Sequence, residues 1–333
     1  MKSEKFFHSS GAVITLIAAC FVVLISLGVR QTFGLFFIDF NESLNISNTA
    51  FGFAIGTQML MWGLTGPIFG AVADRYGGHI AIISAFIFYT FGIYFLYSGP
   101  NTGIFFQIHL GLLIGIGLGG TAISIPMSIV GKHFPLSNRT IAMSIVTAVG
   151  SFGYFISPIF TNYSLIEYGW NYTLFLFGLF LISGLVAAFF VRSPKDNEII
   201  ENRSDQSFKD ALSEAFKSKS YILLVSGFFV CGFHITLVGT HVPKYVIDRG
   251  LEDWTAAAIL SLIGLFNIFG SLLSGYLSTK ISKKVLLSAI YLLRGFSIVF
   301  FIFTPPSVLS AFIFGASFGF LWLSTVPATS GIV

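Results

Sequence analysis

The sequence predicts an all-α membrane protein, a helical bundle with about ten transmembrane helices. Hydrophobic residues make up 55% of the 333 residues and charged residues 10%, whereas soluble domains carry about 25% charged residues. The apolar segments are long enough to cross a bilayer as helices, which takes about 20 residues. They also lack the alternation of transmembrane β-strands. Cys20 and Cys231 lie inside apolar segments, so no disulfide framework is indicated.

The order of the apolar segments predicts two halves. The expected spans lie near residues 11–38, 48–73, 79–98, 103–130, 139–161, 171–191, 220–247, 255–279, 285–304 and 306–333. The first is too long for the apolar region of a cleavable signal peptide. A polar segment, residues 192–219, predicts a cytoplasmic linker between an N-terminal six-helix half, residues 1–191, and an incomplete C-terminal half, residues 220–333. We expect about two further helices to complete the second half.

The basic residues predict the orientation of the chain. With a cytoplasmic N-terminus, the outer loops keep only Lys244 and Arg249, as the positive-inside rule requires. The inner loops hold Lys2, Lys5, Arg75, Lys132, Arg139, six basic residues between Arg192 and Lys219, and Lys280, Lys283 and Lys284. We therefore expect a multi-pass protein of the cell (inner or plasma) membrane. The net charge of +4 indicates no nucleic-acid partner, because these residues lie in interhelical loops.

A polar turn, Gly70–His79, joins the second and third expected spans. Asp74 and Arg75 fall where a span leaves the membrane, and Gly77 and Gly78 allow the backbone to turn tightly. This segment is almost the only charge in its neighbourhood.

The same turn recurs in the second half. Gly275–Lys284 follows Gly70–His79 by 205 residues and carries Thr279 where the first copy has Asp74. A Pro126 near the end of the fourth span likewise has a counterpart at Pro327. Parallel repeats of six helices are typical of one large class of transporters.

The turn resembles the loop 2–3 signature of the major facilitator superfamily, Gly-x3-Asp-Arg-x-Gly-Gly followed by a basic residue, with His79 in the basic position. Together with the order of the spans and the repeat, the resemblance to this superfamily extends over the whole chain. It implies two six-helix repeats that move a small-molecule solute by alternating access, without enzymatic activity or a cofactor. It also implies that Asp74 and Arg75, in a turn built on Gly70, Gly77 and Gly78, form a gate. This gate would latch the two halves together on the inner face in the outward-open state.

Further stretches resemble the monocarboxylate-porter and oxalate/formate-antiporter branch of that superfamily. They are Gly28–Phe36, Gly150–Pro158, Tyr168–Trp170, Gly232–Tyr245 and Gly264–Gly270. This resemblance implies a monocarboxylate or another small organic anion as the substrate.

The chain also departs from that branch. Its animal members are associated with an Asp/Arg pair in helix 8, whereas residues 254–279 contain no charge before Lys280. A transporter of a neutral or cationic solute, such as a sugar or an exported drug, is therefore the alternative. A non-transporting membrane sensor or enzyme is the remote alternative, because no cluster of acid, base and nucleophile is visible. The direction of transport, any co-transported or exchanged ion and the oligomeric state stay open.

Two arginines within spans are candidate substrate ligands, because ionisable groups in a membrane are costly and usually functional. Arg30 lies about 28 Å along the first span at about 1.5 Å per residue and could bind a carboxylate with two hydrogen bonds. The other interpretation is that it snorkels to the surface or bonds to carbonyls. Arg294 lies nearer the midplane, but the ninth helix is peripheral in the resembled fold. That position favours packing or interhelical hydrogen bonding.

Three histidines within spans are the remaining candidates. His234 and His241 lie two turns apart on one face of the seventh span, and His109 lies in the fourth. Each could carry a proton or bind substrate, since imidazole titrates near neutrality, or simply make an interhelical hydrogen bond. The spans contain no well-buried acidic residue for a proton relay. The spacing of histidines, cysteines and acids indicates no metal site.

Overall fold

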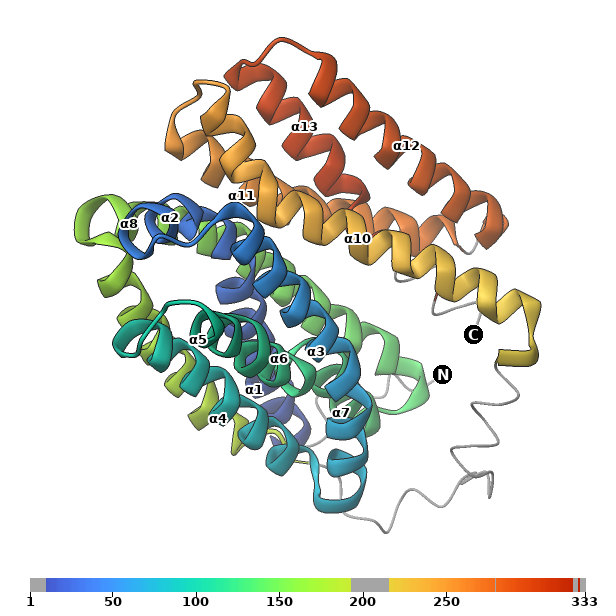
Figure 1. Ribbon diagram of the computed structural model, residues 1–333. Coiled ribbons are helices and arrows are strands. Elements are labelled where there is room, and N and C mark those ends of the chain that lie inside the picture. The colour runs from blue at the N-terminus through green and yellow to red at the C-terminus, as the bar shows by residue number, and fades with distance from the viewer. Residues whose placement is uncertain (1–9, 193–215, 279, 326–328, 330–333) are drawn as a thin grey trace.

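The protein is described by a computed structural model that covers residues 10–192, 216–278, 280–325 and 329. Within these residues the fold is entirely helical, so the predicted all-α class is confirmed. The helices form two bundles that lie side by side (Figure 1). Of the predicted linker, residues 193–215 lie outside the described part of the chain.

The N-terminal bundle contains the elements up to residue 188. They are α1 (Ser10–Gln31), η1 (Phe33–Phe36), α2 (Phe37–Leu44), α3 (Asn48–Tyr76), α4 (Gly78–Ser98), α5 (Ile104–Phe106), η2 (Gln107–Leu113), α6 (Ile114–Thr121), α7 (Ser124–His133) and α8 (Leu136–Ala188). The C-terminal bundle consists of α10 (Lys219–Asp248), α11 (Asp253–Leu277), α12 (Lys283–Phe303) and α13 (Val308–Leu321).

Seven stretches among the described residues are long and apolar enough to cross a membrane. They are Ser10–Leu44, Gly78–Ser98, Ile104–His133, Ile141–Ala188, Lys219–Asp248, Asp253–Leu277 and Lys283–Phe303. The stretch within α8 contains two of the expected spans, joined at Gly169, where φ is 79°. Of the other expected spans, α3 has 29 residues and α13 has 14. The fourth expected span, residues 103–130, coincides with the stretch Ile104–His133, which is divided among α5, η2, α6 and α7.

Local sequence explains where α3 begins and ends. Ser47 caps its N-terminus by accepting a hydrogen bond from the backbone N–H of Ala50 at 3.2 Å. At the other end Gly77 adopts a φ of 102°, which a glycine reaches without steric cost. The polar turn of the sequence therefore starts α4 directly after α3.

The two bundles repeat the same helix contacts. A β-carbon on Gly111 of η2 would lie 3.0 Å from the carbonyl oxygen of Ala54, and one on Gly315 of α13 would lie 3.2 Å from that of Ile259. Buried positions on α4 also recur on α12 at a spacing of 205 residues. The pairs are Ala81 and Leu286, Ile82 and Leu287, Ala85 and Ile290, Tyr89 and Arg294, Gly92 and Ser297, and Leu96 and Phe301. The repeat read from the sequence is therefore present in the packing.

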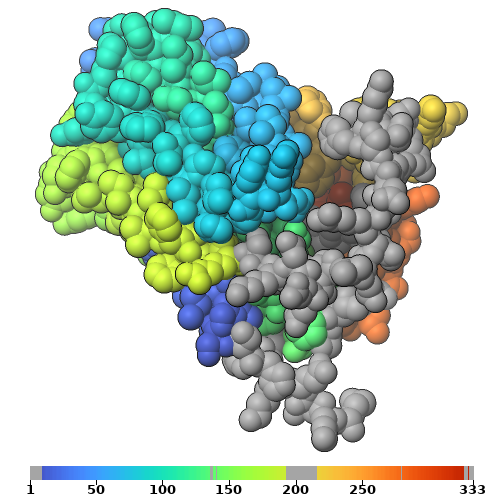
Figure 2. Space-filling model, turned by 90° about the horizontal axis from the view of Figure 1, so that it is seen from below, coloured from blue at the N-terminus to red at the C-terminus, as the bar shows by residue number. Residues whose placement is uncertain are grey.

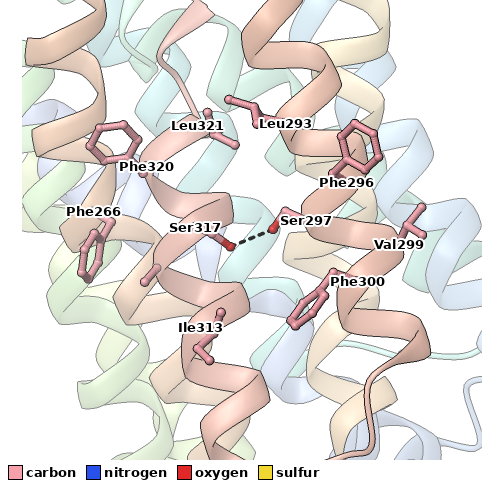
Figure 3. A pocket seen from close by; sticks show the side chains of 11 residues that line it. Phe266, Leu293, Phe296, Ser297, Val299, Phe300, Ile313, Ser317, Phe320 and Leu321 are labelled. Carbon is pink, nitrogen blue, oxygen red and sulfur yellow. Dashed lines mark hydrogen bonds between the residues drawn. The ribbon is translucent and has the colours of Figure 1, made fainter.

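The helix pair α12–α13 is packed more loosely than its counterpart in the first bundle. A β-carbon on Gly117 of α6 would lie 2.7 Å from the backbone nitrogen of Tyr89 on α4, so those helices touch backbone to backbone. The residue equivalent to Gly117 is Leu321, and the pair α12–α13 is instead joined by a hydrogen bond of 2.8 Å between Ser297 and Ser317. An apolar groove of about 840 Å³ lies between these helices and includes Phe266 of α11 (Figure 3).

The two bundles meet at one end and diverge toward the other (Figure 1). At the end where they meet, called here the closed end, Gly34 packs against α10, and a β-carbon there would lie 2.5 Å from the carbonyl oxygen of Gly239. Gly264 of α11 packs as closely on α8, where a β-carbon would lie 2.4 Å from the nitrogen of Phe155. The opposite end, with Asp74 and the start of α10, is called the open end. Seen from below, the N-terminal bundle and the orange C-terminal helices lie on opposite sides (Figure 2).

Candidate functional site

Arg30 lies near the end of α1 and is 5% exposed. Its Nη2 donates to the sulfur of Met59 at 3.3 Å, its Nη1 donates to Oε1 of Gln31 at 3.5 Å, and the guanidinium lies 6.0 Å from the ring centre of Trp62. The ion pairs among the described residues do not include Arg30. The cation is therefore buried among neutral groups.

Gly239 of α10 marks the point where side chains from both bundles converge. A β-carbon on Gly239 would lie 3.7 Å from Nη1 of Arg30, 3.7 Å from Oε1 of Gln31 and 3.9 Å from the indole Cη2 of Trp322. Arg30 and Gln31 come from α1, whereas Trp322 directly follows α13. At these distances a β-carbon would make ordinary van der Waals contact with all three side chains.

Three nitrogen donors in this region are buried without an acceptor. They are Nε of Arg30, Nε2 of Gln31 and Nε1 of Trp322. A buried donor that lacks a partner costs about 1–3 kcal/mol, and native structures contain few of them. An arrangement that offers donors and one positive charge can hold an anion.

The backbone of the C-terminal bundle is broken beside this point. The helix α13 ends at Leu321, and residues 322–324 are not helical. Non-helical backbone at membrane depth needs partners within the protein. Asn267 of α11 accepts from the N–H of Leu323 at 2.9 Å, and Ser274 donates to the carbonyl of Ser324.

Arg294 supplies the remaining partners of this break. Its Nη2 donates to the carbonyl oxygen of Leu321 and, at 2.6 Å, to that of Trp322. Its Nη1 donates to the sulfur of Cys231 on α10 at 3.2 Å. Arg294 is fully buried, and a cation at the C-terminus of a helix also complements the helix dipole. The contacts of Arg294 thus join α10, α12 and the end of α13.

The three histidines do not gather into one cluster. His109 lies in η2, where its Nδ1 is 3.2 Å from Oδ1 of Asn101. His234 on α10 is half-buried, and its Nδ1 has no partner. His241, on the same helix, is exposed, and its ring lies 3.7 Å from the β-carbon position of Gly52. The described residues also contain no group of three or more His, Cys, Asp or Glu that could hold a metal ion.

The Gly70–His79 turn lies at the open end. Asp74 forms an ion pair of 2.8 Å with Lys132, a residue of its own bundle, and its side chain is 70% exposed. The guanidinium of Arg75 lies 5.4 Å from the ring centre of Tyr76. In the second copy, Thr279 lies outside the described residues, and Lys280 lies 5.9 Å from the ring centre of Tyr276.

Sequence reasoning missed three residues that these contacts bring forward. Gln31 follows Arg30 directly, and a second polar residue in an apolar span is a signal that could have found it. Asn267 is a lone amide in the apolar helix α11, which could have drawn attention to it, and it links the bundles by donating to Oγ of Ser151 at 2.8 Å. Trp322 carried no such signal, because an aromatic residue near the end of an apolar span usually reflects packing.

Comparison with known proteins identifies one family across nearly the whole chain. The family model described as Major Facilitator Superfamily matches residues 19–333. Monocarboxylate transporter 6 of Mus musculus is 24% identical over 311 residues, which cover 85% of this chain and 65% of that protein. The agnestins efflux protein AgnL12 of Paecilomyces divaricatus is 24% identical and covers 85% of this chain and 64% of that protein. The chain thus spans slightly less than two-thirds of these relatives.

Two more comparisons concern a sugar-acid transporter and solved structures. The sialic acid transporter NanX of Escherichia coli is 25% identical over 221 residues, or 66% of this chain and 53% of that protein. A bacterial homologue of the human lysosomal transporter Spinster, inward-facing and unoccupied, has a TM-score of 0.72, 16% identity and coverage of 97% of this chain and 75% of that one. The fucose:proton symporter of E. coli has a TM-score of 0.65 at 14% identity and covers 96% and 83%. These two structures share the fold.

Proposed function

The chain belongs to the Major Facilitator Superfamily, and we propose that it is a secondary transporter that carries a small organic anion by alternating access. The observation that carries this proposal is Arg30, a buried cation without a carboxylate partner among the described residues, located where the two bundles meet. Relatives named as monocarboxylate transporters support the same substrate class.

The buried charge of Arg30 is costly without an anionic partner. A charge removed from water without an opposite partner costs several kcal/mol, and a sulfur and an amide oxygen offset little of this. A carboxylate between the bundles would accept two parallel hydrogen bonds from the guanidinium and neutralise it. Arg30 thus favours an anion over a cationic solute.

In this proposal the protein is a multi-pass protein of the plasma or inner membrane with a cytoplasmic N-terminus. The open end faces the cytoplasm, because the basic residues gather there. The substrate site then opens inward, and Asp74 and Arg75 are the latch that closes this end in the outward-open state. Asp74 pairs with Lys132 in the present conformation, so closing would exchange this partner. Asp74→Asn should lower the turnover number and leave KM unchanged, and a raised KM alone would contradict the gating role.

Uptake into proteoliposomes tests the substrate class. The full-length protein should take up lactate, pyruvate, oxalate or formate with saturation. Arg30→Gln should reduce this uptake at least tenfold, which corresponds to about 1.4 kcal/mol. The matched control is Arg249→Gln, because Arg249 is an exposed arginine that lies 4.9 Å from the ring centre of Tyr245. Uptake of a neutral sugar or export of an organic cation, with no carboxylate flux, would overturn the proposal and favour the alternative solutes.

A further inference from the structure

We infer that Gln31 and Trp322 complete a carboxylate-binding site with Arg30, so that one bound anion contacts both bundles. The inference rests on the proposed function and names two further residues of the substrate site and the kind of anion that fits it. It starts from three side chains whose contacts with the rest of the protein are incomplete.

The first step is the match between donors and ligand. Gln31 is 1% exposed and Trp322 is fully buried, yet Nε2 of Gln31, Nε1 of Trp322 and Nε of Arg30 have no acceptor. The single acceptor on these side chains, Oε1 of Gln31, faces Nη1 of Arg30 at 3.5 Å. What stays unpaired is a set of N–H groups, which a carboxylate satisfies because it only accepts hydrogen bonds.

The second step is that the donors come from opposite bundles. Arg30 and Gln31 lie on α1, and Trp322 follows α13, but Nη1 of Arg30, Oε1 of Gln31 and the indole carbon Cη2 of Trp322 lie 3.7–3.9 Å from the β-carbon position of Gly239. The side chains that carry the unpaired donors therefore converge there. A ligand held there would draw the two bundles together. A binding site shared between halves is what alternating access requires, because the ligand must stay bound while the halves move.

The third step is that the break after α13 is built so that it fixes Trp322. Arg294 holds the carbonyl of Trp322 at 2.6 Å, and Asn267 holds the N–H of the next residue, Leu323, at 2.9 Å. These two bonds hold the peptide group after Trp322, and Arg294 also donates to the carbonyl of Leu321 in the peptide group before it, so both peptide groups that flank the Cα of Trp322 are bonded to buried side chains. Arg294 and Asn267 are positioning residues in this arrangement, since they act on the site through the backbone of Trp322.

The walls of the site define the rest of the ligand. The guanidinium of Arg30 lies 3.3 Å from the sulfur of Met59 and 6.0 Å from the ring centre of Trp62. These neighbours, with the indole of Trp322, are apolar or aromatic. Arg30 offers one positive charge for one carboxylate, whereas the other buried arginine, Arg294, donates through Nη1 and Nη2 to Cys231, Leu321 and Trp322. The ligand class is therefore a monocarboxylate with a small apolar body, in preference to a dicarboxylate.

The experiment measures lactate uptake by the full-length protein in proteoliposomes. Trp322→Phe keeps an aromatic ring and removes the indole N–H, and Gln31→Met keeps the length and removes the amide. Each variant should raise KM for lactate about tenfold and change the maximal rate less than twofold, because each removes one hydrogen bond to a charged ligand. The control is Trp254→Phe, an exposed tryptophan whose N–H is bonded to Glu252 at 2.6 Å, and it should leave KM unchanged.

A second readout separates binding from movement. Lactate should raise the melting temperature of the purified protein, and Trp322→Phe should reduce this shift while Trp254→Phe retains it. Succinate should compete with lactate uptake at least tenfold more weakly than pyruvate. If Trp322→Phe does not fold, Gln31→Met tests the same site from the other bundle.

The outcomes distinguish the inference from the function on which it rests. Lactate uptake with an unchanged KM in both Trp322→Phe and Gln31→Met would overturn the shared site and leave the transport of anions intact. Succinate competing as well as pyruvate would overturn the monocarboxylate preference. A wild-type protein that moves no carboxylate would overturn the proposed function and this inference together.

Discussion

Tyr89 on α4 and Arg294 on α12 occupy equivalent positions, 205 residues apart, but they make different hydrogen bonds. Tyr89 donates its hydroxyl to the carbonyl oxygen of Ser26 at 3.1 Å. Arg294 donates to the sulfur of Cys231, the residue equivalent to Ser26, and also to two carbonyls at the end of α13. The helix junction around Tyr89 and Ser26 is therefore neutral, whereas the equivalent junction around Arg294 and Cys231 contains a buried cation.

The third member of each junction confirms that they correspond. Oγ of Ser26 lies 2.6 Å from Oγ1 of Thr121 at the end of α6, and the sulfur of Cys231 lies 3.3 Å from Oγ1 of Thr325 just beyond α13. Both junctions therefore join the first, third and fourth helices of a half. The comparison teaches that the repeat conserves a hydrogen-bonded scaffold, while residue substitutions within it give the second half a charged clamp.

The helices around the neutral junction also pack more tightly than those around the charged junction. In the first bundle Gly92 packs on α6, where a β-carbon would lie 2.5 Å from Cγ1 of Ile114. Its equivalent, Ser297, bonds to Ser317 across the wider α12–α13 interface. Figure 3 shows these two serines pointing toward each other between Phe296 and Phe300 on one helix and Ile313 on the other. The charged junction thus belongs to the more loosely packed pair of helices.

The largest expected effect on stability comes from removing the guanidinium of Arg294, the charged clamp of the second half. Arg294→Met should lower the free energy of unfolding by about 3 kcal/mol, since each buried acceptor left without a partner costs about 1–3 kcal/mol. An unfolding titration in mixed detergent micelles measures this. An increase in stability would mean that the cost of burying the cation exceeds the value of its hydrogen bonds. The clamp would then be dispensable for the fold.

The next effect concerns a pair of equivalent glycines at the closed end. Gly34→Ala should cost about 1–3 kcal/mol, the usual range for overpacking, because its β-carbon would lie 2.5 Å from the carbonyl oxygen of Gly239. Gly239→Ala should be nearly neutral for stability, since its nearest neighbours lie at 3.7 Å. Thermal unfolding of the two variants in parallel tests this asymmetry. Equal losses would show that the two glycines contribute alike to the contact.

A smaller effect is expected at the neutral junction. Tyr89→Phe removes one hydrogen bond, to the carbonyl of Ser26, and should cost about 1 kcal/mol. The same unfolding titration as for Arg294→Met allows a direct comparison. A loss as large as that of the arginine variant would contradict the distinction between the junctions.

The smallest effect should follow from making the charged junction more like the neutral one. Cys231→Ser restores the residue type found at Ser26, and a hydroxyl can take over the contacts with Arg294 and Thr325. The free energy of unfolding should change by less than about 1 kcal/mol, because the partners on both sides are retained. A loss comparable to that of Arg294→Met would show that the size of the sulfur, rather than its hydrogen bonds, holds this junction.

Much of the fold could be predicted because it follows from local properties of the chain. The apolar length of each segment predicts a helix that can span a membrane, and the recurrence of the Gly70 turn predicts a repeat that the packing of α4 and α12 displays. The exact boundaries of the helices were harder to predict from the sequence. Residues 103–130 read as one uniform apolar span, yet they contain the π-helical turn of η2 and a break after Thr121. Such interruptions depend on contacts with neighbouring helices and leave little trace in hydropathy.

The sequence by itself determined that the chain is a helical membrane protein, that its halves repeat, and that Arg30 and Arg294 are the cations within its spans. Only the tertiary structure decided what these cations meet. Arg294 donates hydrogen bonds to backbone carbonyls. Arg30 instead donates to the sulfur of Met59 and the amide oxygen of Gln31, and it has no carboxylate partner among the described residues. The physical reason is distance along the chain. Arg30 and Trp322 are separated by nearly the whole sequence, and only the tertiary packing of the two bundles brings both side chains to Gly239.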